Sequence, residues 1–297
     1  MINNYLKKFH ASDVELALQF FVQNGYVLIE GIYEREYIIE ISEWIQSRFR
    51  HLLEKSKNNE IPFDINGWAV SIIKKLEQSP LYPGLSNREE LHSILRRILG
   101  TDICVLGQEA LWINYPTDDD PVLNKGVHTD AWTGTSVNTI FAKYFVTDCD
   151  AYNGMTVVPG SHMFGFVPCR NRAVDPHAHL DDYLEEINLE HARSGDLLIW
   201  HALLLHATRG HSDKNTRISI TSRYKSTETQ FSSQERSLGY RPICVGPLNQ
   251  ILRTIGSDSL SPFRTLGGHV GVDRRLQHLY GYGAFKTSID YDKFIEP

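Results

Sequence analysis

The chain has 297 residues, of which 41% are hydrophobic and 22% are charged. This composition is typical of a globular protein and excludes a disordered, collagen-like or coiled-coil chain. The 36 acidic residues outnumber the 30 lysines and arginines, and the resulting net charge of −6 disfavours a broad nucleic-acid-binding surface.

The first hundred residues predict helices around one short strand. Apolar residues at helical spacing follow Ser12 and Glu15, whose separation is that of a capping box, and predict a helix that Asn24-Gly25 ends. Residues 26–29 then predict a strand. Two further helices are expected over residues 36–55 and 87–99, the latter followed by a glycine at its C-terminal end.

From about residue 103 the pattern changes to short β-branched and aromatic segments separated by turn residues. We predict strands at 103–106, 109–115, 138–146, 154–158, 196–201 and 217–224. Several short strands of this kind favour a sandwich or a barrel. We expect a single domain over residues 1–297, with a helical part (1–100), a β-core (101–225) and a loop-rich C-terminal wrap (226–297).

The candidate chemistry begins at His128-Thr129-Asp130. Two residues apart on a strand, His128 and Asp130 would face the same side and could share a metal ion, although for this pair alone a hydrogen-bonded couple is the more ordinary interpretation. Two histidines and one carboxylate form the facial triad of non-heme Fe(II) oxygenases, and the apolar segment 195–208 offers His201 and His206. Arg217 follows, and its guanidinium suits a dicarboxylate co-substrate.

Four segments, in this order, resemble the phytanoyl-CoA dioxygenase family of Fe(II)- and 2-oxoglutarate-dependent oxygenases. They are His128-Thr129-Asp130, the NGMTVVPGSH segment at 153–162, the segment from Gly195-Asp196 to His206, and Arg217. Residues 21–31 also resemble the family's opening. The resemblance implies a mainly β protein with flanking helices, in which N-terminal helices surround a double-stranded β-helix (jelly-roll, cupin-like) core.

The resemblance also implies roles for individual residues. It assigns iron binding to His128, Asp130 and His206, and 2-oxoglutarate binding to Arg217, Thr208 and Asn114. On this assignment His201 becomes a core or pocket residue. Halogenating relatives replace the carboxylate ligand with Gly or Ala, so Asp130 favours hydroxylation or another oxidation. Ala207, where the family often has Gly, and residues 226–297, which carry no family motif, depart from the pattern.

The implied function is a dioxygenase that hydroxylates a small molecule while 2-oxoglutarate is converted to succinate and carbon dioxide. A cupin-type isomerase or hydrolase and a non-catalytic small-molecule-binding barrel are the alternatives, and neither explains Arg217. Trp132, His201 and Arg170 are candidate substrate residues, with ordinary aromatic packing, core packing and surface charge as the other interpretations. The substrate and the oligomeric state stay open.

The insertion at 170–194 is polar and follows the PGSH turn, so we expect a mobile lid or, alternatively, a rigid docked helix. Four cysteines without CxxC spacing indicate free thiols in a reducing compartment. No apolar run approaches the length of a membrane span and no signal peptide is apparent. These observations predict a cytoplasmic protein without a membrane or nucleic-acid partner.

Overall fold

The computed structural model describes residues 5–248, except 83–84, 86–87, 108, 117–125, 171–172, 176–184 and 209–215. The expected helices and the one expected strand at the N-terminal end are confirmed, whereas a first strand at Lys8–His10 and a helix after the second one were not indicated by the sequence. The α-helices in the described ranges are α1 (Val14–Asn24), α2 (Arg35–Lys57), α3 (Ile65–Glu77), α5 (Glu89–Leu99) and α6 (Ser233–Leu238). None of them is long and apolar enough to cross a membrane.

Most strands of the described chain belong to one large mixed sheet. It contains β1 (Lys8–His10), β2 (Tyr26–Glu30), β10 (Leu197–His201), β5 (Thr139–Phe145), β12 (Arg217–Ser226), β3 (Ile103–Leu106) and β13 (Tyr240–Cys244), in this spatial order, and β4 (Ala110–Asn114) also pairs with β12. A smaller sheet has the order β11 (His206–Thr208), β6 (Met155–Val157) and β9 (Ile187–Asn188). β7 (Cys169–Arg170) and β8 (Ala173–Val174) form a separate pair.

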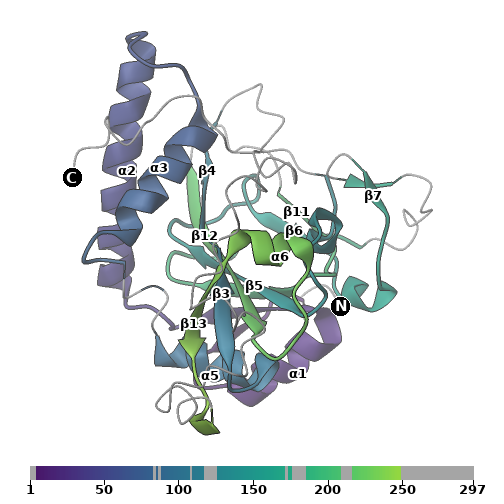
Figure 1. Ribbon diagram of the computed structural model, residues 1–297. Helices are drawn as coiled ribbons and strands as arrows, with labels where there is room; N and C mark the ends of the chain where they lie inside the picture. Colours follow the sequence, from purple (N-terminus) through teal and green to yellow (C-terminus); the bar gives the residue numbers. More distant parts are fainter. Residues whose placement is uncertain are drawn as a thin grey trace.

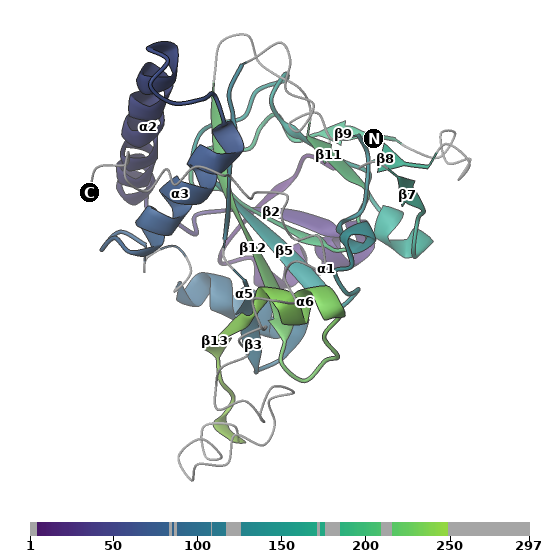
Figure 2. The same cartoon turned by 45° about the horizontal axis from the view of Figure 1, so that its top comes forward.

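The large sheet is buried on both faces, as the central strand β5 shows. Ile140, Ala142 and Tyr144 point into a core that includes α2 and α3, whereas Phe141 and Phe145 point into a second core that includes the small sheet. This division follows from the two-residue periodicity of a strand. Figures 1 and 2 show α2 and α3 on one side of β12 and β5, and the strands β6 and β11 on the other. The protein is therefore mainly β, with a few helices.

The start of α1 differs from the sequence prediction. The helix begins at Val14, its N-cap is Asp13, and no side chain caps it. Ser12 is held elsewhere, because its hydroxyl lies 2.9 Å from Nδ1 of His10. The capping box predicted from Ser12 and Glu15 is therefore wrong, although the helix itself is confirmed.

The C-terminal segment contains more regular structure than its sequence indicated. In the described part, β13 pairs with β3, and α6 opens with a capping box in which Ser232 and Glu235 bond each other's backbone amides. The expectation of a loop-rich wrap is thus too simple for residues 226–248, and residues 249–297 lie outside the described chain.

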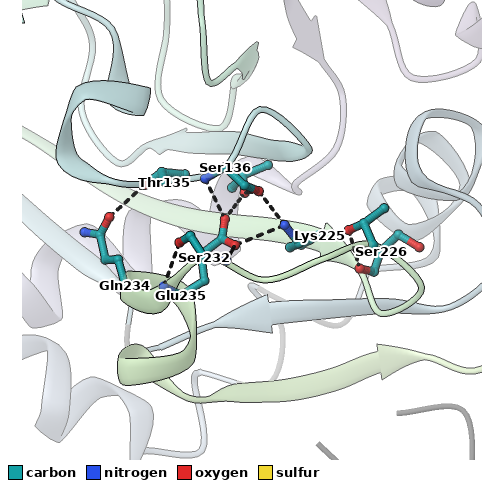
Figure 3. Close-up of polar contacts among 9 residues, drawn as sticks. Thr135, Ser136, Lys225, Ser226, Ser232, Gln234 and Glu235 are labelled. Atoms are coloured by element: carbon teal, nitrogen blue, oxygen red, sulfur yellow. Dashed lines mark hydrogen bonds and ion pairs between the residues drawn. The ribbon is translucent and has the colours of Figure 1, made fainter. Parts of the chain in front are cut away.

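A buried ion pair fastens α6 to the sheet (Figure 3). Lys225 on β12 donates to Glu235 at 3.0 Å and also to the hydroxyl of Ser136, and the side chains of the pair are 0% and 1% exposed. Glu235 further accepts from the backbone N–H of Ser136 at 2.9 Å and from the hydroxyl of Thr139 at 2.6 Å. Every charge in this cluster is therefore hydrogen-bonded, as burial requires.

Candidate metal centre

Three potential metal ligands meet where the large and small sheets approach each other. His128, Asp130 and His206 each offer a donor atom, and these atoms all lie within 4.8 Å of one another. The carboxylate oxygen Oδ2 of Asp130 is 3.5 Å from Nε2 of His206. Among the described residues, this is the group of His, Cys, Asp and Glu side chains suited to hold a metal ion.

The backbone brings the two histidines together through an isolated antiparallel bridge. The amide of His128 donates to the carbonyl of His206, and the amide of His206 donates to the carbonyl of His128, both at 2.9 Å. The chain then turns, and Asp130 opens a short 3₁₀ helix (Asp130–Thr133). The expectation that His128 and Asp130 lie on one straight strand is wrong, because a turn and not strand periodicity places the carboxylate.

Both imidazole rings are oriented by backbone carbonyls. Nδ1 of His128 lies 2.7 Å from the carbonyl oxygen of Gly126, and Nδ1 of His206 lies 3.0 Å from that of Leu204. A carbonyl oxygen only accepts, so each Nδ1 carries the proton and Nε2 is left as the basic nitrogen. This is the usual way in which a protein prepares a histidine as a metal ligand.

Asp130 is held as a carboxylate. Burial by itself raises the pKa of Asp130, but the neighbouring His206 and His128 and the indole N–H of Trp200 outweigh burial and keep the pKa below its usual value. The Trp200 Nε1 donates to Oδ2 at 2.9 Å. No motif in the sequence singled out Trp200, and its only sequence signal was its position on the predicted strand just before His201.

His201 lies apart from the three ligand-type residues. It ends β10, and its Nδ1 accepts from the amide of Leu203 at 3.2 Å. Its ring centroid is 6.0 Å from that of His162, and burial, together with His162, lowers the pKa of His201. The structure therefore brings His206, and not His201, together with His128 and Asp130.

The PGSH turn supports the strand that carries His206. The hydroxyl of Ser161 accepts from the amide of Leu205 at 2.8 Å, and the amide of Gly160, at a φ of +77°, donates to the carbonyl of Asn24 at 2.9 Å. His162 packs over Gly25, where an added Cβ would come within 2.5 Å of its Nδ1. The turn thus ties the end of α1 to the residues before β11.

Arg217 lies at the start of β12 and is only 1% exposed. One terminal nitrogen donates to the carbonyl of Asn153, and the Cys149 thiol lies against the guanidinium. Within the described part of the chain the buried Nε has no hydrogen-bond partner. Burial lowers the pKa of Arg217, and its ordinary value is high enough that the charge persists. Among the described residues no carboxylate forms an ion pair with this guanidinium, so its surroundings suit an added anion.

Of the other residues expected at the co-substrate site, one lies on a strand paired with β12 and one on the small sheet. Asn114 on β4 is buried and stands opposite Arg217 in the strand register. Thr208 ends β11 and is half-buried. The contacts of Asn153 and Cys149 with Arg217 were not anticipated from the sequence, although Asn153 belongs to the motif used for the family resemblance.

Several sequence predictions fall where nothing can be said of the side chains. The side chains of Trp132 and Arg170 lie outside the described part, although their backbones belong to the 3₁₀ helix and to β7. Of the proposed lid at 170–194, residues 171–172 and 176–184 also lie outside it. The described part of that insertion includes the short strands β8 and β9.

A mainly β fold with two histidines and one carboxylate at a sheet junction defines the class of facial-triad metalloproteins. The sequence profile of the family described as phytanoyl-CoA dioxygenase (PhyH) matches residues 21–219, and the chain belongs to this family. A search of curated proteins found no match.

Solved structures with a similar fold include several non-heme enzymes. The non-heme monooxygenase ThoJ, in its apo form, is 16% identical with a TM-score of 0.59, covering 78% of this chain and 84% of that chain. The epimerase SnoN, solved with Fe³⁺, α-ketoglutarate and nogalamycin RO, is 16% identical with a TM-score of 0.54, covering 74% and 86%. The carbocyclase SnoK from nogalamycin biosynthesis is 19% identical with a TM-score of 0.53, covering 76% and 89%. At these identities the similarity concerns the fold.

Proposed function

We propose that this protein is an Fe(II)- and 2-oxoglutarate-dependent dioxygenase that hydroxylates a small molecule in the cytoplasm. The observation that carries the proposal is the convergence of two oriented histidines and a carboxylate, and it is supported by a buried arginine whose Nε lacks a hydrogen-bond partner among the described residues. We further propose that the two sheets form a double-stranded β-helix core and that the whole chain is one domain.

The residues present fit both groups that this reaction requires. His128, Asp130 and His206 would hold the metal, which when bound supplies the redox chemistry for dioxygen. Arg217 would bind the distal carboxylate of 2-oxoglutarate, because a guanidinium offers two parallel donors to a carboxylate. Thr208 and Asn114 would complete that site. The balanced reaction consumes dioxygen, 2-oxoglutarate and the substrate, and gives succinate, carbon dioxide and the hydroxylated product.

The presence of Asp130 favours hydroxylation over halogenation, since the carboxylate ligand is retained. Related folds carry out varied oxidations, as the names epimerase and carbocyclase indicate for SnoN and SnoK. The SnoN complex contains a small organic molecule, nogalamycin RO, alongside α-ketoglutarate. We therefore propose a small organic substrate for this protein too, with Trp132, His201 and Arg170 as candidate contacts.

The test has two measurements. Fe(II) and then 2-oxoglutarate are added without oxygen, and a weak visible absorption band is looked for. Succinate release is then measured in air with candidate substrates. We expect the wild type to bind one Fe(II) per chain and to show the band. His206→Ala should lose the metal, the band and succinate formation, because one of the three ligands is gone. His201→Ala is the matched control and should keep iron binding. An exchange of these two phenotypes, or a wild type without the band, would contradict the proposal.

A further inference from the structure

Trp200 has a defined place beside the candidate metal centre. It lies on β10 opposite Phe141 of β5, and the two rings stack with centroids 5.2 Å apart and an interplanar angle of 20°. Its side chain is on the same face of the sheet as the second core and is 3% exposed. The strand register and the burial in the second core place the indole, and the Phe141 ring packs on its face.

The indole edge points at Asp130. Its Nε1 donates to Oδ2 at 2.9 Å, and the same oxygen lies 3.5 Å from Nε2 of His206. The Trp200 ring is also 5.6 Å, centroid to centroid, from the ring of His206. One buried indole therefore contacts the carboxylate and packs near a histidine of the same candidate site.

A carboxylate on a short side chain can rotate about its last bond, and this torsion is broad and only weakly restrained. Asp130 begins a 3₁₀ helix and, unlike the two histidines, is not held in the reciprocal bridge. An indole N–H can only donate a hydrogen bond, and a buried one requires an acceptor. The bond therefore restrains the plane of the carboxylate as well as satisfying the indole.

We infer that Trp200 is a positioning residue that orients the Asp130 carboxylate for metal binding. The inference rests on the metal site proposed above. Outer partners of this kind typically change metal affinity by about 10- to 100-fold when they are removed. Trp200 needs no contact with a substrate to have this effect.

The experiment measures Co(II) binding by visible absorption, without co-substrate or turnover. In Trp200→Phe the aromatic ring is kept and the N–H is removed. We expect its Co(II) affinity to fall by about 10- to 100-fold and its absorption spectrum to change. The control is Phe141→Leu, which loosens the packing on the Trp200 ring and leaves the N–H in place. That variant should bind Co(II) with an affinity close to wild type.

The outcomes separate the two proposals. If Trp200→Phe binds Co(II) as tightly as the wild type, or if Phe141→Leu weakens binding equally, the positioning role is overturned while the metal site stands. If the wild type itself binds no Co(II), both are overturned. Should Trp200→Phe fail to fold, benzothienylalanine incorporated at position 200 replaces the N–H by sulfur with the same ring shape. Undiminished Co(II) affinity in that protein would likewise overturn the inference.

Discussion

Arg217 and Lys225 are two buried cations on the same face of strand β12, and their surroundings differ. Lys225 is paired with Glu235, and that carboxylate is in turn bonded to Ser136 and Thr139. Arg217 donates to the carbonyl of Asn153, and its Nε has no hydrogen-bond partner in the part of the chain that the structure describes. Burying a charge is costly unless it is paired and hydrogen-bonded. The Lys225–Glu235 pair, whose charges are satisfied, therefore stabilises the fold. The Arg217 guanidinium can still donate hydrogen bonds to a ligand.

The largest effect is expected when one partner of the satisfied pair is removed. Lys225→Met leaves the Glu235 charge buried without its cation, and breaking such a pair costs about 3–5 kcal/mol. We expect this loss in the free energy of unfolding measured with urea. The double variant Lys225→Met/Glu235→Leu removes both charges and should recover much of it. A single variant as stable as the wild type would show that the ion pair is not what fastens α6.

At Arg217 the expected effect of a substitution is on ligand binding and not on folding. Arg217→Met removes a charge that forms no close ion pair with a carboxylate of the described residues, so the free energy of unfolding should fall far less than in Lys225→Met. The concentration of 2-oxoglutarate needed for half-maximal turnover should rise by more than about tenfold, since losing a buried charge-assisted contact costs about 2–5 kcal/mol. Metal content should stay normal. An unchanged 2-oxoglutarate requirement in Arg217→Met would contradict the proposal that Arg217 binds the co-substrate.

Several strands, and the Arg217 side of this comparison, could be predicted from the sequence. The strands at 103–106, 138–146 and 196–201 are confirmed to within one or two residues, because they are short, mainly apolar segments between turn residues. Arg217 could be singled out by its distance from His206 within the family pattern. These signals are local, or are carried by a motif with a fixed order.

The satisfied pair had no comparable signal. Helix α6 has six residues, too few for a repeat of apolar residues at helical spacing to be recognised. The capping box that starts it has the same spacing as the Ser12–Glu15 pair, which forms no cap. The partner of Asp130 was also missed, because Trp200 on β10 lies far in sequence from the turn that carries Asp130. Contacts between distant residues depend on the register of the sheet, which one sequence does not specify.

The smallest expected effect is on the way in which stability depends on pH. Burial raises the pKa of Glu235, but the bonds from Thr139, from the amides of Ser232 and Ser136, and from Lys225 outweigh it and hold the pKa below its usual value. A depressed carboxyl pKa contributes stability that is full above the unfolded-state value, about 4.3, and is lost as the pH falls through the folded-state value. The stability difference between wild type and Glu235→Gln should therefore shrink on acidification below about pH 4. A constant difference from neutral pH down to acid unfolding would contradict this assignment.

The reciprocal bridge between His128 and His206 has a consequence for the stability of the fold. The two residues come from distant parts of the chain, so bringing them together carries a loop-closure cost that the packing of the sheets has to offset. A metal ion bound by both histidines would favour the folded chain, in which they are adjacent, over the unfolded chain, in which they are apart. Its contribution to stability would follow mass action and increase with the logarithm of the metal concentration.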